Sequence, residues 1–365
     1  MRVGRYAVGW PTVSATWRMV RDARRVRRAG VPRLAAPDPE AMAREVLRAN
    51  AREVLRSGSG HFHDMWVADL GKAFAGATRE LPREYLAGLL DRIVSVSARV
   101  GRVPTCFTPR GWHDLPWPRA DSLPWLLHMV ETLDDPAFLA ERHGALRKTY
   151  ADWAAATIDP ATGLVRRDVT GDWMDTVPRP SSTYNNLMAL RAAQAARRLD
   201  LGDAALDVDA LLASRWTGTH LRDHAASGDY LSADANVPAL YHGLLRADAR
   251  RAIARALEAS ALVRPVPMRT REGAYARDEL PPLTRLAPSY HSTTWLHLGL
   301  MLANGLKREG APWRHHVEAV EASVLAHGNF LETLDERGEP HRSRWLSTEH
   351  GFSMSAGLYL EAVSE

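Results

Sequence analysis

Residues Gly171–Pro180 read GDWMDTVPRP, and the next eight residues, Ser181–Met188, read SSTYNNLM. The first stretch places two carboxylates around a tryptophan and contains two prolines, which is typical of an ordered loop. The second is a polar opening to a segment whose apolar residues recur at helical spacing as far as Leu199. A chemically unusual loop that leads directly into a helix is the pattern on which the predicted fold depends.

The same alternation of helices and loops continues along most of the chain. Apolar residues at helical spacing, bounded by polar caps, prolines and glycines, predict about twelve helices. They are expected at Pro39–Arg56, Trp66–Ala77, Pro82–Val100, Asp121–Leu133, Pro136–Thr157, Ser181–Leu199, Ala205–Trp216, Val237–Leu245, Ala247–Ser260, Ser292–Leu306, Ala311–His327 and Ser353–Val363. Only Met1–Val20, an alternating and aromatic-rich run, indicates strand.

The connections alternate between short turns and long segments rich in Pro, Gly and Trp. About six helix pairs, with one long loop per pair, predict an all-α fold: an (α/α)6 toroid of two concentric helix rings, with the long loops forming the active-site face. A helical solenoid is the rival fold, but no fixed-period repeat is visible. We expect one catalytic domain over residues 1–365, with residues 1–37 as an N-terminal extension packed on it.

The composition excludes several classes of protein. A chain of 365 residues with 45% hydrophobic residues can bury a large core, and its formal net charge of +4 is small. Cys106 is the only cysteine, so no intrachain disulfide is expected. The chain has no run of about 18 apolar residues and no signal-peptide pattern at its start. We therefore expect a cytoplasmic protein without a membrane partner.

Six arginines lie between Arg18 and Arg28. Such a run can bind nucleic acid or an anionic membrane, but it is also typical of a solvated helix face. The small net charge favours the solvated face, and we expect no nucleic-acid partner. The sequence leaves open whether the protein is a homo-oligomer.

Seven of the 12 tryptophans lie in the long loops or at their edges. Flat aromatic rings stack on the C–H faces of sugars, while carboxylates, Asn and His bind the hydroxyls. Tryptophans that fill small cores beneath the loops would give the same pattern, but three of the seven have an acid nearby in the sequence. The pairs are Trp66 with Asp69, Trp117 with Asp121, and Trp173 with Asp175. These pairs favour a carbohydrate substrate.

Two segments resemble those that carry the catalytic acids of the α/α-toroid glycosidases, most closely glycoside hydrolase family 63 and the glucosidase domain of glycogen debranching enzymes. Trp173–Arg179, WMDTVPR, is similar to the Gly-Met-Asp-Asn-Ser-Pro-Arg motif of the general acid. Phe330–Gly338, FLETLDERG, is similar to the Glu-Asn-Tyr-Asp segment of the general base, although Thr333-Leu334 replaces Asn-Tyr. The resemblance implies Asp175 as the acid and Glu332 as the base.

Weaker similarities to the family extend from Trp66 to Leu360. The N-terminal β-sandwich of larger family members has no room in this chain, and the lack of that domain favours a small glycoside as the substrate. The resemblance and the loop pattern together imply a set of substrate-binding residues. They are Trp66, Asp69, Trp117, Asp121, Trp125, Trp173, Arg179, Tyr184, Asn185, Asp234, Asn236, His291, Trp295, Trp345 and Glu349.

Inverting glycosidases need a protonated carboxyl on one side of the anomeric carbon and a carboxylate that holds water on the other, roughly 6.5–9.5 Å apart. The apolar neighbours of Asp175 favour its protonated form, and the charged turn after Glu332 favours an ionised base. Two alternatives stay open for these acids: a turn or cap role for Asp175, and a helix-end role for Glu332. Glu349 is the competing candidate for the base.

We predict an inverting α-glycosidase that acts on a small α-glucoside, an α-mannoside or a short α-glucan. Two alternatives remain: a sugar isomerase or epimerase that uses His61, His63, His242 or His291, and a carbohydrate-binding protein without activity. We predict no cofactor and no metal, because the HFHD run at His61–Asp64 is a weak ligand pattern and no nucleotide-binding glycine motif is present.

Overall fold

The computed structural model describes residues 2, 3, 6, 7, 10–114, 119–174, 177, 179–275, 280, 290–343 and 347–364, with the backbone only at residues 2, 3, 6, 7, 10–13, 15, 16 and 291. The predicted all-α class is confirmed: these residues form thirteen α-helices and a few strands of two or three residues. None of the described helices is long and apolar enough to cross a bilayer.

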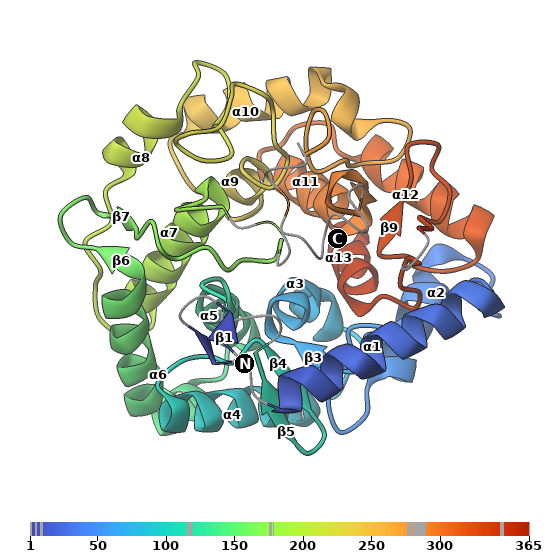
Figure 1. Ribbon diagram of the computed structural model, residues 1–365, viewed down its shortest axis with the longest axis horizontal. Helices are drawn as coiled ribbons and strands as arrows, with labels where there is room; N and C mark the ends of the chain where they lie inside the picture. Colours follow the sequence, from blue (N-terminus) through green and yellow to red (C-terminus); the bar gives the residue numbers. More distant parts are fainter. Residues whose placement is uncertain are drawn as a thin grey trace.

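Six helices form a closed cycle around the centre of the molecule (Figure 1). Each of them packs against the next, and the last packs against the first. In a solenoid the first and last repeats lie apart, whereas here the last helix of the chain packs against the first helix of the cycle. In order round the cycle they are α3 (Val67–Ala77), α5 (Ser122–Leu133), α7 (Thr183–Arg198), α9 (Val237–Tyr241), α11 (Leu296–Arg308) and α13 (Ser353–Val363).

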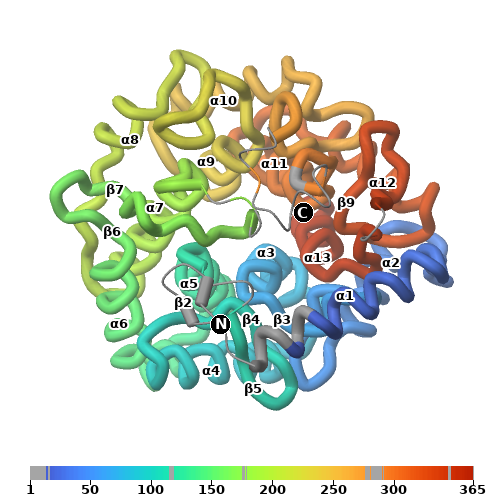
Figure 2. Tube along the Cα trace, in the orientation of Figure 1, coloured from blue at the N-terminus to red at the C-terminus, as the bar shows by residue number. Residues whose placement is uncertain are grey.

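A second set of helices lies outside this cycle, and the chain runs once round the molecule as it alternates between the two sets (Figure 2). The outer helices are α2 (Pro39–Asn50), α4 (Arg83–Val100), α6 (Pro136–Thr157), α8 (Val208–Arg215), α10 (Ala247–Ala259) and α12 (Arg314–His327). Sequence explains the division. α11 buries every residue from Leu296 to Leu306, whereas α10 buries only the i, i+4 stripe of Ala249, Ile253 and Leu257.

Short antiparallel ladders connect the loops at the helix ends. β3 (Met65–Trp66) pairs with β4 (Cys106–Thr108), which pairs with β5 (Gly111–His113). β8 (Thr294–Trp295) pairs with β9 (Thr333–Leu334), and this ladder places the loop before α11 beside the loop before α13. Two further hairpins are β1 (Arg2–Val3) with β2 (Tyr6–Ala7), and β6 (Ile158–Asp159) with β7 (Leu164–Val165).

Two sequence predictions about the N-terminal part were wrong. The strand predicted over Met1–Val20 is confined to β1 and β2, and α1 (Trp10–Ala29) follows, with Ala23 and Val26 buried one turn apart. The helix predicted over Pro39–Arg56 ends at Asn50, because the Asn50 side chain bonds to Gly351 O and Ser353 Oγ and the backbone becomes extended at the next residue.

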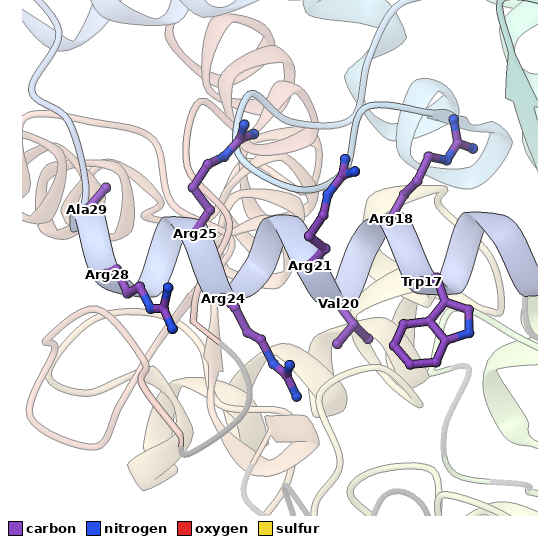
Figure 3. Close-up of a pocket in the computed structure, with 8 residues that line it drawn as sticks. All are labelled: Trp17, Arg18, Val20, Arg21, Arg24, Arg25, Arg28 and Ala29. Carbon is purple, nitrogen blue, oxygen red and sulfur yellow. The ribbon is translucent and has the colours of Figure 1, made fainter.

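The arginine run lies on α1, and Figure 3 shows the side chains of Arg18, Arg21, Arg24, Arg25 and Arg28 projecting from the helix, as does the exposed ring of Trp17. Several of these arginines have acidic neighbours. Arg21 and Arg25 lie 3.1 and 3.8 Å from the carboxylate of Asp22, and Arg18 lies 3.6 Å from that of Asp64. Asp64 belongs to the loop before β3, so α1 is tied to that loop by charge.

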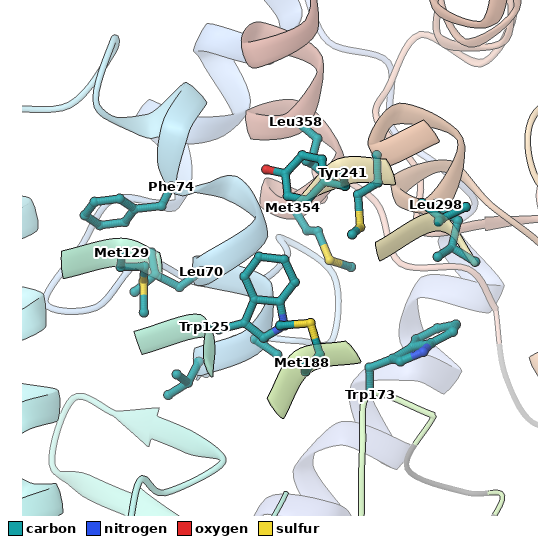
Figure 4. Close-up of a cluster of buried hydrophobic side chains, with 14 of the residues drawn as sticks. Leu70, Phe74, Trp125, Met129, Trp173, Met188, Tyr241, Leu298, Met354 and Leu358 are labelled. Carbon is teal, nitrogen blue, oxygen red and sulfur yellow. The ribbon is translucent and has the colours of Figure 1, made fainter. Parts of the chain in front are cut away.

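The closest helix contact in the cycle depends on two glycines. A Cβ added to Gly76 of α3 would lie 2.0 Å from the carbonyl oxygen of Gly357 of α13, and a Cβ on Gly357 would lie 2.4 Å from Ala73 O. Both neighbours are backbone atoms of buried helices and cannot move aside without separating the helices. Large aromatic and aliphatic side chains from several helices of the cycle gather in the buried core (Figure 4).

We expect Gly357→Ala to lower the free energy of unfolding by at least about 1–3 kcal/mol, because the added methyl overpacks the contact between α3 and α13. Gly88→Ala is the matched control: Gly88 lies in α4 with nothing within 4 Å of the position of its Cβ. That variant should be neutral or more stable by about 0.5–1 kcal/mol. Urea denaturation of both variants checks the difference, and equal effects would contradict the packing argument.

Candidate active site

A buried arginine, Arg179, organises the loop that begins at Gly171. The Arg179 guanidinium lies 2.9 Å from Asp172, 2.7 Å from Asp223 and 2.5 Å from Asp234, and all four side chains are almost fully buried. Asp172 also accepts hydrogen bonds from Ser182 Oγ and from the backbone N–H of Met174. These four charged residues are hereafter the Arg179 cluster. The cluster fixes both ends of the segment 172–179.

The Arg179 cluster holds more negative than positive formal charge. Burial raises the pKa of Asp172 to about 6, and the Asp234 and Asp121 carboxylates add to the rise against the opposing effect of Arg179. Trp173, the next residue, donates from its indole Nε1 to Asp234 at 3.1 Å. The cluster therefore also fixes the orientation of the Trp173 ring.

The Trp173 ring forms one wall of a small pocket at the end of the helix cycle. Aromatic rings and charged groups line this pocket together, as expected for a site that binds a polar ligand with flat apolar faces. The lining residues are Phe62, Trp66, Asp69, Lys72, Arg119, Trp173, Tyr290, Trp295, Glu332, Phe352 and Met354.

Glu332 is the buried carboxylate of this pocket. Tyr290 donates its hydroxyl hydrogen to Glu332 Oε1 at 2.7 Å, and the backbone N–H of Glu349 approaches Oε2 at 3.4 Å. Burial raises the pKa of Glu332 well above its usual value, and the Tyr290 hydrogen bond acts in the opposite direction. Glu332 is thus a carboxyl group with few hydrogen-bond donors around it and an open side toward the pocket.

Glu349 has the opposite environment. Its carboxylate accepts four backbone N–H groups, those of Gly60, His61, Phe62 and His350, at 2.6–2.8 Å, and the His61 ring lies 3.1 Å away. Burial alone would raise the pKa of Glu349, but the charges of His61 and His350 and these hydrogen bonds leave it below its usual value. Glu349 therefore anchors the loop 60–62 and does not line the pocket.

Two tryptophans of the pocket pack edge to face. The rings of Trp173 and Trp295 are 5.0 Å apart at 84°. Among the other lining residues, the Arg119 guanidinium lies 4.6 Å from the centre of the Trp66 ring. Asp69 lies in the first turn of α3, where the positive end of the helix dipole favours a carboxylate. The structure thus brings together Trp66, Asp69, Trp173, Trp295 and Glu332, which the sequence predicted for the site.

Other predicted residues lie behind the pocket and bond to one another. The Trp125 indole donates to the Tyr184 hydroxyl, which donates to Asp121, and these three are buried. Asn236 bonds to backbone groups of its own loop, and Asn185 donates to Gly171 O at 3.4 Å. These residues, with Arg179 and Asp234, support the loops of the site and do not line it.

Several predicted residues cannot be placed. Asp175, Trp117 and Trp345 lie outside the described residues, as does the side chain of His291. Asp175 falls within the segment 172–179, whose two ends the Arg179 cluster fixes.

Three of the four histidines suggested for proton transfer, His61, His63 and His242, have described side chains and contact other groups. His61 pairs with Glu349, and His63 lies 3.8 Å from Asp22. His242 packs against Trp125 and His128 behind the pocket, and burial lowers its pKa well below the usual value. Among the residues with described side chains, the one group of three that could hold a metal ion is Glu258, His315 and His316, on the outer helices α10 and α12.

Six residues line the pocket that the sequence did not predict for the site: Lys72, Arg119, Tyr290, Phe62, Phe352 and Met354. Arg119 and Tyr290 lie next to or near the predicted residues Asp121 and His291 in the sequence, so a signal for them existed. Lys72 gave none, because a lysine within a helical pattern is ordinarily solvated.

No protein-family profile and no curated protein sequence matches the chain. Several solved structures do match the chain in fold. Mannosylglycerate hydrolase of glycoside hydrolase family 63 from Thermus thermophilus, bound to glucose, is 16% identical and superimposes with a TM-score of 0.62 over 90% of this chain and 100% of that chain. A glycosidase is 15% identical, with a TM-score of 0.57 over 97% and 98% of the two chains.

A rhamnosidase from Klebsiella oxytoca bound to rhamnose is 16% identical, with a TM-score of 0.58 over 91% of this chain and 65% of that chain. At such identities the likeness is one of fold. The resemblance that the sequence predicted, to α/α-toroid glycosidases closest to family 63, is confirmed at that level.

We expect Arg179→Met to lower the free energy of unfolding by about 3–5 kcal/mol at pH 8, because three buried carboxylates lose their cation. Without Arg179 the pKa of Asp172, which burial already raises, rises further above its value in the unfolded chain. A raised folded-state pKa means that stability is lost as the pH increases through it, so the deficit should shrink at pH 5.

The control is Arg197→Met, which removes an exposed ion pair with Asp203. It should cost at most about 1 kcal/mol. Urea denaturation at pH 5 and pH 8 measures the difference in the free energy of unfolding between each of the two variants and the wild type. A deficit for Arg179→Met that does not change with pH would show that packing, and not charge, accounts for the loss.

Proposed function

We propose that this protein is an inverting glycoside hydrolase built on an (α/α)6 toroid, with Asp175 as the general acid and Glu332 as the general base. The observation that carries the proposal is the place of Glu332: a buried carboxyl group in an aromatic pocket that also contains Trp173, from the loop that bears Asp175. The named structural neighbours, which are glycosidases, support the same class of reaction.

In this mechanism the Glu332 carboxylate removes a proton from a water molecule, and the water oxygen bonds to the anomeric carbon. The bond from that carbon to the leaving oxygen breaks, and Asp175 gives its proton to this oxygen. Glu332 is then protonated and Asp175 ionised, and exchange with solvent restores both. The faces of Trp66, Trp173 and Trp295 suit the C–H faces of a sugar ring, and Asp69 suits its hydroxyls.

The substrate that we propose is a small α-glucoside or α-mannoside, or a short α-glucan. A small glycoside is supported by the neighbour from Thermus thermophilus, which is by name a mannosylglycerate hydrolase. Glu332 is favoured over Glu349 as the base because four backbone N–H groups already occupy the Glu349 carboxylate.

The experiment that tests the mechanism is hydrolysis of α-glucosides and α-mannosides, followed by NMR of the first-formed anomer. We expect inversion to the β-anomer, with activity lowered at least about 10²–10⁴-fold in Glu332→Gln and partly restored by azide on an α-glycosyl fluoride. Glu349→Gln should instead lower thermal stability, because an amide replaces an acceptor of four N–H groups. Retention of configuration would reject the mechanism.

The acidic limb of the pH profile should report Glu332. Because its folded-state pKa is raised, kcat/KM should rise with pH through a value well above 4.5, as the base loses its proton. Tyr290→Phe removes the hydrogen bond that favours the ionised carboxylate, so this limb should move to higher pH. Measurement of kcat/KM from pH 4 to 9 checks the shift, and an unmoved limb would exclude Glu332 as the titrating base.

A further inference from the structure

Lys72 is a buried cation at the base of the pocket, with no acceptor among the described residues. Its side chain is 1% exposed, and its ammonium nitrogen makes no hydrogen bond within the described part of the chain. The ammonium lies 5.4 Å from the centre of the Trp125 ring and 5.9 Å from that of Trp173. The aromatic faces attract the charge of the ammonium, but they have no lone pair that could accept a normal hydrogen bond. Its three N–H donors therefore remain without acceptors in the described part of the chain.

Lysine is rare in this protein, which makes its presence here informative. The chain contains 44 arginines and three lysines. Lys148 pairs with Asp152 on the surface, and Lys307 donates to backbone carbonyls at the end of α13. Each of these two has an acceptor, whereas Lys72 has none in the described part of the molecule. The pocket thus contains a compact ammonium, Lys72, in addition to the planar guanidinium of Arg119.

The depth of Lys72 indicates which part of a ligand it would meet. Asp69, in the first turn of α3, keeps part of its surface exposed. Lys72 follows three residues later on the same side of the helix, about 4.5 Å further along the axis. His297 of α11 is a second buried polar group at this depth: neither ring nitrogen has a hydrogen-bond partner among the described residues, and the ring lies 5.1 Å from that of Trp173.

Burial of an unpaired ammonium is costly, and a neutral hydroxyl acceptor offsets only part of that cost, whereas a carboxylate offsets far more. We propose that Lys72 is a specificity-determining residue that binds a carboxylate on the terminal sugar, so that the preferred α-glucoside or α-mannoside is the one whose sugar carries its C6 as a carboxylate, a hexuronic acid glycoside. The inference rests on the proposed glycosidase function and names its substrate class.

The charges that face Lys72 are consistent with this role. Burial lowers the pKa of Lys72 below its usual value; the carboxylates of Asp69, Asp121 and Asp172 oppose this effect, and Arg119 adds to it. Asp121 accepts from Tyr184, and Asp172 belongs to the Arg179 cluster, so both have other partners. The buried His297 is kept neutral by burial and by Lys72 itself, which lower its pKa. A ligand carboxylate would therefore add the acceptor that this part of the pocket lacks.

Binding of free sugars tests the inference without requiring hydrolysis. Isothermal titration calorimetry would compare glucuronate with glucose and with glucuronamide, a neutral isostere. We expect the wild-type protein to bind glucuronate at least about tenfold more tightly than either neutral sugar, as one charge-assisted hydrogen bond would give. Lys72→Met should lower the affinity for glucuronate at least about tenfold more than the affinity for glucose, and so remove that preference. Lys148→Met, the matched control, should behave as the wild type.

Equal or tighter binding of glucose by the wild type would overturn the inference, as would an equal loss for all three sugars in Lys72→Met. A preference for free glycerate would place the carboxylate on the leaving group and also reject it. Should Lys72→Met fail to fold, the wild type still decides: glucuronate affinity must fall as the pH rises through the lysine pKa, while glucose affinity stays constant. Hydrolysis of neutral glycosides with no uronate preference would reject this inference alone.

Discussion

The buried contact of Arg179 with Asp172, Asp223 and Asp234 is the constraint on which the candidate site depends. One guanidinium cannot neutralise three carboxylates, and each of the four would be costly to bury alone. The arrangement persists only if the loops that carry these residues stay together. Asp172 and Arg179 come from the loop before α7, and the other two aspartates come from the loop between α8 and α9. The cluster therefore joins two loops that are far apart in sequence.

A second anchor of the opposite kind works on the other side of the pocket. There the anion is at the centre: the Glu349 carboxylate collects the backbone N–H groups of the loop 60–62 and so holds Phe62 against the pocket. Between the two anchors, the ladder of β8 with β9 fixes Trp295 close to Glu332. Aromatic walls and the catalytic candidate are thus oriented by buried charge and backbone hydrogen bonds, and the helices beneath supply a rigid base.

Local sequence predicted most of the helices, because burial on one side leaves apolar residues at a period of 3.6 residues and burial on all sides leaves a long apolar run. It failed at Met1–Val20, where aromatic residues alternate by chance and the apolar stripe of α1 is thin. Within the site, the loop pattern indicated Trp66 and Trp173, and the resemblance to family 63 indicated Glu332. The loop pattern could not separate Trp125 from these rings, because whether a tryptophan faces the pocket or the core depends on its contact with Tyr184 of another helix. Local sequence could not indicate Lys72 for the same reason, because the burial of this side chain depends on the packing of the closed helix cycle.

The difference between Glu332 and Glu349 shows how one short region yields two kinds of carboxylate. Both are buried, and the backbone N–H of Glu332 bonds to the carbonyl of Glu349. Four N–H donors stabilise the charge on Glu349 and reduce its affinity for a proton. Glu332 has one hydroxyl donor, a distant N–H and apolar rings, so its affinity for a proton is increased. A general base must attract a proton and must also have a free lone pair for water, and of these two carboxylates only Glu332 meets both requirements.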